Sequence, residues 1–453
     1  MDKAICEGFK SLGIQIPGIL LPRKGIDMGK WSVVACDQYT SQPEYWQEAA
    51  SYVADGPSTL SLIFPEVYLE ENGSGQRIKN INASMKSFVE DGILVPQQPG
   101  FIYVDRKTCC TGSRKGLMLA VDLERYDYRK GSQSLIRATE GTVVERLPPR
   151  IKVRKNASLE LPHIMLLIDD PGKTVIEPLA RHVHSMERLY DFELMMGGGH
   201  ISGYKADSPQ LVAEILNALN RLACPQGFRK KYGVSDDKEV LLFAVGDGNH
   251  SLATAKACWE ELKGSLSAEE QELHPARYAL VELVNVHDDG LVFEPIHRVV
   301  FNVSPQKVLD AMTEYMGGCG MEYRCFDSKG RLELYLASLP SSAGHVLPFV
   351  SSMGFGAITV ANPVCNLEVG TLQAFLDELA DRDKSVKTDY IHGGDVVDSL
   401  GGQEGNMGFY LPPMDKNDLF KTVILDGALP RKTFSMGEAS EKRFYLECRK
   451  IKP

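Results

Sequence analysis

Short apolar runs and helically spaced apolar stripes follow one another along the chain. The runs at 101–104 (FIYV), 161–168 (LPHIMLLI) and 240–245 (VLLFAV) predict buried strands. Residues 208–224 combine Ser208 at a capping position and Pro209 at the first helical position with a leucine- and isoleucine-rich stripe, which predicts a helix. The stripe consists of Leu211, Ile215, Leu219 and Leu222.

The same patterns predict further elements and a mixed architecture. We expect short strands within 14–34, helices over 43–53, 78–89, 304–316 and 371–379, and strands over 116–123, 277–286, 331–337 and 344–350. The strands at 101–104 and 116–123 are expected to pair antiparallel through a turn around Gly112. Helices mixed with strands, without an internal repeat, predict an α/β or α+β protein. The 453 residues suggest two or three modules, with a boundary near 303–320.

One corner of this pattern suits a phosphate. The stretch 245–256 (VGDGNHSLATAK) follows an apolar run, and after it Leu252, Ala255, Trp259 and Leu262 share one helical face. Glycines allow a tight turn and close approach of a ligand, and a helix start offers N–H donors and a positive dipole end. The alternative is a capped helix start in which Asp247 or Asn249 accepts backbone N–H bonds.

Composition narrows the classes of protein. With 50 Lys+Arg against 60 Asp+Glu the net charge is -10, which argues against unspecific nucleic-acid binding. The 10 cysteines form no C-x-x-C pair, and His182 and His184 are expected on a solvated helix face, so we predict reduced thiols and no protein-bound transition metal. The first residues do not read as a secretory signal and no apolar run approaches bilayer length, so we expect a cytoplasmic protein without a membrane segment.

Three further stretches place charged or polar residues beside glycine or proline. In 137–150 (RATEGTVVERLPPR), Glu140 could accept a proton or help to hold magnesium, or it could be a solvated loop acid. In 294–298 (EPIHR), the His-Arg pair could bind an anion or be structural. In 429–435 (LPRKTFS), the basic residues could close over a phosphate or form an exposed turn. The candidate residues of these stretches are Glu140, Thr142, His297, Arg298, Arg431, Lys432 and Thr433.

Together these stretches resemble the bacterial family called domain of unknown function 1015, over nearly the whole chain. That family resembles the ParB/sulfiredoxin-like superfamily, whose signature is a D-G-x-H-R type loop at a helix start. The loop is matched here by 247–251, with Ser251 where relatives usually carry arginine. An H-E-x-T stretch is matched by 139–142, with Thr139 in place of histidine, and P-x-H-R and P-x-K-S-T-like stretches are matched by 295–298 and 430–433.

The resemblance implies an α+β fold. It implies a mixed-sheet core of ParB/sulfiredoxin-like type with large insertions over 1–310, and a C-terminal α/β region over 311–453 that contributes a basic tail to the site. Relatives bind ATP, ADP or CTP at the loop. Sulfiredoxin chemistry is disfavoured because Asn249 stands where its thiol would be, and a DNA clamp is disfavoured because no basic helix-turn-helix is evident.

The activity implied is phosphoryl transfer to a small hydroxy acid, with serine and phosphoserine as the first substrates to consider, ATP or ADP as nucleotide and magnesium as the metal. Glu140, His250 and Asp247 are the expected catalytic residues. The expected phosphate ligands are Gly246, Gly248, Asn249, Ser251, Thr142, His297, Arg298, Arg431, Lys432 and Thr433. The alternatives are a non-catalytic nucleotide-sensing regulator that contacts a protein partner, and hydrolysis of a phosphate ester by the same residues.

Overall fold

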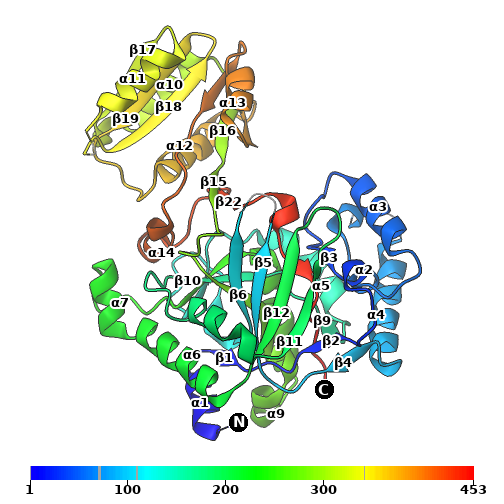
Figure 1. Ribbon diagram of the computed structural model, residues 1–453. Coiled ribbons are helices and arrows are strands. Elements are labelled where there is room, and N and C mark those ends of the chain that lie inside the picture. Colours follow the sequence, from blue (N-terminus) through cyan, green and yellow to red (C-terminus); the bar gives the residue numbers. More distant parts are fainter. Residues whose placement is uncertain (1, 70–72, 109–110, 341) are drawn as a thin grey trace. The chain divides into compact units, whose positions relative to one another are not determined.

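The computed structural model describes residues 2–69, 73–108, 111–340 and 342–453 (Figure 1). It divides into two compact units. Unit 1 comprises Met1–Val292 and Met436–Pro453, and unit 2 comprises Phe293–Ser435. The division after residue 310 that the sequence suggested stays a prediction. In the structure α10 (Pro305–Tyr315) buries Val308, Leu309 and Met312 and belongs to unit 2, and the last residues of the chain belong to unit 1.

Unit 1 is built on a large mixed sheet, so the predicted α+β class is confirmed. Its strands run in the order β11-β12-β5-β6-β14-β10-β13-β8-β7, with β1 paired to β6. In that order their bounds are Arg188–Glu193, His200–Ala206, Phe101–Lys107, Ser113–Asp122, Tyr278–Asn285, Met165–Ile168, Phe243–Asp247, Ile136–Ala138 and Tyr126–Asp127, and β1 is Ile14–Gln15.

The strand directions set which loops meet at each end of the sheet. β8 and β13 are parallel, with Ala138 opposite Val245. β10 runs antiparallel to β13 and parallel to β14, so the end of β13 meets the beginning of β10. Loops after β8 and β13 and before β10 therefore gather at one end of the strands.

Helices cover both faces of this sheet (Figure 1). Alternate residues of β5 show why: Phe101 and Tyr103 belong to one apolar core, and Ile102 and Val104 belong to the other. A strand buried on both faces needs apolar side chains at every position, which is the continuous run that the sequence shows. The helices are α1 (Lys3–Ser11), α2 (Met28–Trp31), α3 (Pro43–Val53), α4 (Ser74–Glu90), α5 (Leu147–Arg154), α6 (Pro209–Leu222), α7 (Pro225–Tyr232), α8 (Asn249–Lys263) and α9 (Ala268–Leu273).

The C-terminal residues belong to unit 1 because they form short strands that pair with earlier strands of that unit. β23 (Phe444–Tyr445) pairs with β3 (Val33–Val34), and β24 (Arg449–Lys450) pairs with β9 (Leu159–Glu160). A further short pair joins β2 (Leu20–Pro22) and β4 (Leu94–Pro96). These pairings bring residues near 440 beside residues near 35 and 160.

Unit 2 contains a six-stranded sheet whose neighbouring strands are antiparallel. The order is β17 (Met321–Phe326), β19 (Gly354–Val360), β18 (His345–Ser351), β21 (Asn406–Phe409), β16 (His297–Phe301) and β20 (Lys387–Ile391). Besides α10 its helices are α11 (Lys329–Ser338), α12 (Glu368–Arg382), α13 (Gly394–Gly401) and α14 (Lys416–Leu425), and β15 (Phe293–Pro295) pairs with β22 (Phe434–Met436).

One predicted element of unit 2 is wrong. Residues 331–337 form most of helix α11, where a strand was expected. The alternation of leucine with charged residues suggested a strand, but Leu, Glu, Arg and Ala are strong helix formers. Leu332 is buried while Leu334 is exposed, so the alternation does not reflect one buried strand face.

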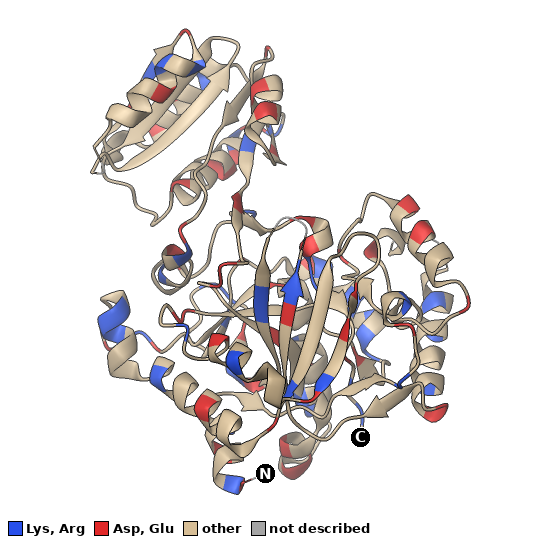
Figure 2. Ribbon diagram, in the orientation of Figure 1, with Lys and Arg blue, Asp and Glu red and all other residues tan. Residues whose placement is uncertain are grey.

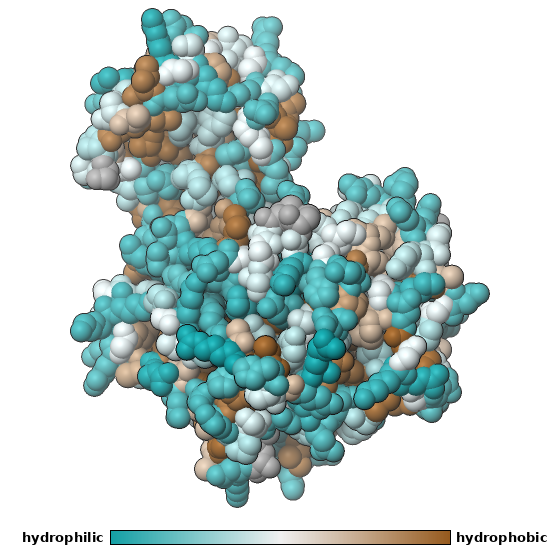
Figure 3. Space-filling view, in the orientation of Figure 1, coloured by the Kyte–Doolittle hydropathy of each residue, from teal (hydrophilic) through white to brown (hydrophobic). Residues whose placement is uncertain are grey.

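The surface bears mixed charges and scattered apolar groups. In Figure 2 the blue and red residues are interspersed over the ribbon. The face in Figure 3 is mainly hydrophilic, with hydrophobic residues in small separate groups. Within the described residues, none of the helices has both the length and the apolar character needed to span a bilayer. The described cysteines are free, while Cys109 and Cys110 lie outside the described residues.

Candidate functional site

The predicted strand, glycine corner and helix are confirmed. β13 ends at Asp247, Gly248 adopts a left-handed conformation with φ 79°, and α8 begins at Asn249. Leu252, Ala255 and Trp259 of the predicted stripe are buried. The first helical hydrogen bond runs from Leu252 N to Gly248 O at 3.0 Å, so the preceding N–H groups point out of the helix start.

The capping alternative is met only in part. Gly248 stands at the N-cap and has no side chain with which to cap α8. The Oδ1 of Asp247 accepts the N–H of Gly248 at 2.9 Å, and the amide of Asn249 donates weakly to Val245 O at 3.4 Å. Among the described residues, the buried Oδ1 of Asn249 and Oγ1 of Thr142 have no hydrogen-bond partner. Such atoms are suited to contact a ligand.

Two carboxylates stand at the same end of neighbouring strands. Since Ala138 and Val245 are opposite each other in parallel strands, Glu140 and Asp247 each follow two residues later. The hydroxyl of Thr139 donates to Val245 O at 2.6 Å and so ties the two strand ends together. Thr139 therefore has a structural role at the position where the family pattern has histidine.

A lysine from the C-terminal segment forms an ion pair with one of these two carboxylates, Asp247. Lys442 Nζ lies 3.2 Å from Asp247 Oδ2, and both side chains are largely buried. The backbone of Lys442 is held because Arg106 donates to its carbonyl at 2.7 Å and to Ser440 O at 2.8 Å. No local motif signals Lys442, because it is distant in sequence and reaches the loop only through the folding of 436–453 into unit 1.

Ser251 faces a second cation that the sequence did not reveal. Its Oγ lies 3.0 Å from Nε2 of His163, which precedes β10, and the same nitrogen lies 3.5 Å from Asp37 Oδ2. The Nδ1 of His163 is 2.8 Å from the hydroxyl of Tyr445, which in turn contacts Cys36 Sγ at 3.0 Å. The segments 36–37, 163, 251 and 445 therefore meet in one polar cluster.

The charges around His163 favour its protonated form. Burial by itself lowers the pKa of this histidine, but Asp37, with further contributions from Asp247 and Glu66, outweighs it, and the pKa of His163 is raised. Burial works against ionisation of Asp37 too, yet the charge and hydrogen bond of His163 hold the Asp37 pKa well below its usual range. By contrast, burial raises the pKa of the Cys36 thiol, so Cys36 is not an activated nucleophile.

The other predicted ligands lie in unit 2. Arg298 is fully buried, and its guanidinium donates to Gln373 Oε1 at 2.9 Å and to the carbonyls of Arg431 and Lys432, both at 3.0 Å. These bonds hold the 431–432 backbone, which is the structural role given above as the alternative; anion binding by Arg298 stays a prediction.

His297 and the tail residues also have local partners. His297 Nδ1 accepts the N–H of Leu411 at 3.0 Å, and burial, with the charge of Arg298, lowers the pKa of His297. Arg431 forms an ion pair with Asp377, and the hydroxyl of Thr433 donates to Pro430 O at 2.7 Å. The expected convergence of these residues on the loop stays a prediction.

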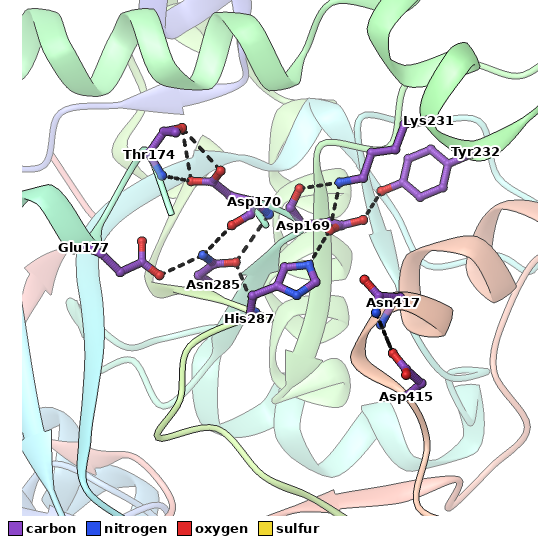
Figure 4. Close-up of polar contacts among 10 residues, drawn as sticks. All are labelled: Asp169, Asp170, Thr174, Glu177, Lys231, Tyr232, Asn285, His287, Asp415 and Asn417. Carbon is purple, nitrogen blue, oxygen red and sulfur yellow. Dashed lines mark hydrogen bonds and ion pairs between the residues drawn. The ribbon is translucent and has the colours of Figure 1, made fainter. Parts of the chain in front are cut away.

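A second polar cluster lies at the other end of β10 (Figure 4). The Asp169 carboxylate lies 2.7 Å from His287 Nε2 and forms an ion pair with Lys231 Nζ at 2.8 Å. It also accepts a hydrogen bond from the hydroxyl of Tyr232. Asp170 accepts the backbone N–H of Val175 at 2.9 Å. Both carboxylates are hydrogen-bonded to protein groups, so we interpret this cluster as stabilising the turn after β10.

Within the described residues, no group of three or more His, Cys, Asp or Glu side chains could hold a metal ion. Magnesium is usually held by one or two carboxylates together with substrate phosphates. Glu140 and Asp247 are the carboxylates at the loop that fit this arrangement.

No curated protein matches the chain. Solved structures with partial similarity include a conserved hypothetical protein from Pyrococcus furiosus, with 11% identity, a TM-score of 0.35 and coverage of 74% of this chain and 95% of that one. A free serine kinase in complex with AMP has 11% identity, a TM-score of 0.34 and coverage of 74% and 91%. SbnI with a C-terminal truncation from Staphylococcus aureus has 9% identity, a TM-score of 0.34 and coverage of 71% and 83%.

A family model described as "Protein of unknown function (DUF1015)" matches residues 20–379, which is most of the sequence. The match includes the β13–α8 corner, Glu140 and His163. The chain therefore belongs to the DUF1015 family.

Proposed function

We propose that this protein is a nucleotide-binding phosphotransferase with a core of ParB/sulfiredoxin-like type, acting on a small hydroxy acid. The observation that carries the proposal is the combination at the start of α8. An uncapped helix start lies beside a carboxylate that is paired with a cation, because Asp247 contacts Lys442. Phosphoryl transfer needs N–H donors and cations for phosphate oxygens and a carboxylate for the acceptor hydroxyl or for magnesium.

The residues divide these tasks by their chemistry. The N–H groups at 249–251 and the partial positive charge of the helix start would receive phosphate oxygens. Lys442 and protonated His163 would offset the negative charge that a phosphate brings to Asp247 and Ser251. Relatives usually carry arginine at the position of Ser251, and Lys442 and His163 would supply the positive charge that this arginine would provide. Their charge supports phosphate binding although the arginine is missing.

Glu140 is the proposed base. It follows the end of β8 by two residues, at the end of the sheet where β13 ends at Asp247, so one carboxylate can accept the proton of an acceptor hydroxyl while the other stays paired with Lys442. Magnesium, when bound, would offset the negative charge of the phosphates; Asp247 would help to hold it, and holding magnesium is the alternative role for Glu140. His250 stands in the first turn of α8, where it would flank the transferred group.

The direct test is transfer of the γ-phosphoryl group of ATP to serine, with release of ADP followed in parallel. We expect phosphoserine to form in the presence of magnesium. We expect Glu140→Gln to abolish transfer and leave ATP binding largely intact, since the carboxylate acts on the acceptor and not on the nucleotide. The matched control is Glu145→Gln, an exposed acid in the same loop.

Three results would separate the alternatives. Unchanged transfer by Glu140→Gln removes Glu140 from the mechanism. Binding of ATP without transfer to serine or another hydroxy acid favours a nucleotide-sensing regulator. Release of phosphate from phosphoserine without nucleotide favours phosphate-ester hydrolysis.

A further inference from the structure

A small pocket lies beside the start of α8 in unit 1, and the proposed function uses only the part of its wall formed by His163 and Ser251. Its volume is about 150 Å³. Ser251 and Thr254 of α8 form part of its wall, and His163 and Tyr445 bring polar groups to it. Much of the remaining wall is apolar, with contributions from Leu62, Phe64, Met85, Val153, Leu159 and Leu280.

The charged residues of the wall are already paired with protein groups. Arg150 binds Glu66 through two hydrogen bonds, from Nε at 2.8 Å and from Nη2 at 2.5 Å. Arg154 Nη2 lies 2.6 Å from Glu160, and Glu160 also accepts a hydrogen bond from Arg449 at 2.7 Å. A ligand that needs its own carboxylate or ammonium neutralised would have to break one of these pairs, which is unfavourable because it leaves a partly buried charge without its partner.

This wall therefore suits an uncharged group rather than a free amino acid. A cavity of about 150 Å³ with a largely apolar wall is large enough for an aromatic ring. The hydroxyl of Tyr445 could meet the polar edge of a heterocycle, while the apolar side chains would contact its faces.

The pocket and the helix start share residues. Ile164 lines the pocket, and it also packs against the loop, since a Cβ at Gly248 would stand 3.0 Å from Ile164 Cγ1. Ser251 belongs to both. A ligand with an uncharged ring at one end and phosphate at the other would span the two regions.

We propose that this pocket binds the nucleobase of a nucleotide whose phosphates lie at the start of α8. This inference rests on the proposed function for the phosphate end, and it assigns the acceptor hydroxy acid to a place outside the pocket. The recognised chemistry is an uncharged heterocyclic ring, so nucleosides without phosphate should bind weakly by themselves.

The test separates the ring from the phosphates. Calorimetric titrations of the full chain would use adenosine, cytidine, tripolyphosphate and ATP, with wild type, Ala157→Phe and Val153→Phe. Ala157 and Val153 both line the pocket, so a phenyl group at either position would fill it. Ala50→Phe, on an exposed position of α3, is the matched control, and melting curves verify that each variant is folded.

We expect wild type and the control to bind a nucleoside. In both pocket variants we expect the nucleoside affinity to fall at least tenfold and the ATP affinity to fall to that of tripolyphosphate. The affinity for tripolyphosphate itself should be the same as in wild type. Equal nucleoside binding by wild type and both folded pocket variants would overturn the inference, as would the absence of nucleoside binding to wild type. Nucleoside binding that depends on the pocket, without any binding of tripolyphosphate or ATP, would support the ring site and contradict the phosphotransferase proposal.

Discussion

The hydroxyl oxygen of Ser251 lies 3.0 Å from Nε2 of His163, between the start of α8 and the segment that precedes β10. Asp37 approaches the same nitrogen, while Nδ1 faces Tyr445. A Ser-His-Asp nucleophile needs the acid at the opposite ring nitrogen from the serine. His163 is therefore placed to supply positive charge beside the loop, not to activate Ser251.

His163 should make stability depend on pH. Because its folded pKa is raised above the ordinary 6.5, its contribution is fully present below 6.5 and is lost as pH rises through the folded pKa. Urea unfolding between about pH 6 and pH 9 should show stability falling with pH in wild type. His163→Gln should flatten this fall, whereas substitution of the exposed His184 should not. An identical pH profile for His163→Gln would contradict the assigned charge.

Gly248 should tolerate no side chain. Its φ of 79° lies in the left-handed region, which costs other residues about 1–2 kcal/mol, and a Cβ would also stand 3.1 Å from Ile164 Cα. We expect Gly248→Ala to lower the free energy of unfolding by at least this amount and to weaken ATP binding. Gly264→Ala is the control, since the nearest atom to its Cβ would be 3.9 Å away. Equal stability of the two variants in chemical denaturation would refute this account of the corner.

Lys442 should matter more for anion binding than a surface lysine. Lys442→Met removes the partner of Asp247 and leaves that carboxylate facing the phosphate, so the ATP affinity should fall about tenfold or more, which is about 1.4 kcal/mol. The exposed Lys450 offers the control Lys450→Met. If both variants bind ATP as wild type does in calorimetry, Lys442 is not part of the nucleotide site.

Arg443 should be essential to the stability of unit 1. It is buried with Glu282, 3.0 Å from its Nη1, and with Glu447, so Arg443→Met would leave two buried carboxylates uncompensated. Breaking a buried pair in this way typically costs about 3–5 kcal/mol. Arg188→Met removes an exposed pair with Asp191 and should cost less than about 1 kcal/mol. Denaturant titration that finds similar losses for both would contradict the structural role of the C-terminal segment.

The sequence predicts an element well where the residues within one short stretch all favour the same structure. The glycine corner at 245–251 and the helix over 208–224 were predicted because strand, turn and helix propensities agree within each stretch. Residues 331–337 were assigned wrongly because leucine alternation and helix propensity disagree there.

The charge environment of the site could not be predicted in the same way. Asp37, His163, Lys442 and Tyr445 meet Ser251 and Asp247 only through pairing of β3 with β23 and the order of strands in the sheet. Lys442 and Tyr445 also lie beyond the residues that the family model matches. His163 lies inside the apolar run 161–168, and a single histidine in such a run does not identify a charged site.

Ser251→Asp tests the phosphate site most directly. An aspartate in the first turn is favourable for the helix dipole and would face His163, so the variant should fold with stability close to that of wild type. Its charge would repel phosphate from the helix start. The measurement is the rise in melting temperature caused by ATP, with and without magnesium, in wild type, Ser251→Asp and Ser251→Asn. The account predicts a rise in wild type and Ser251→Asn that is lost in Ser251→Asp. An equal rise in all three, or none in wild type, would contradict phosphate binding at the start of α8.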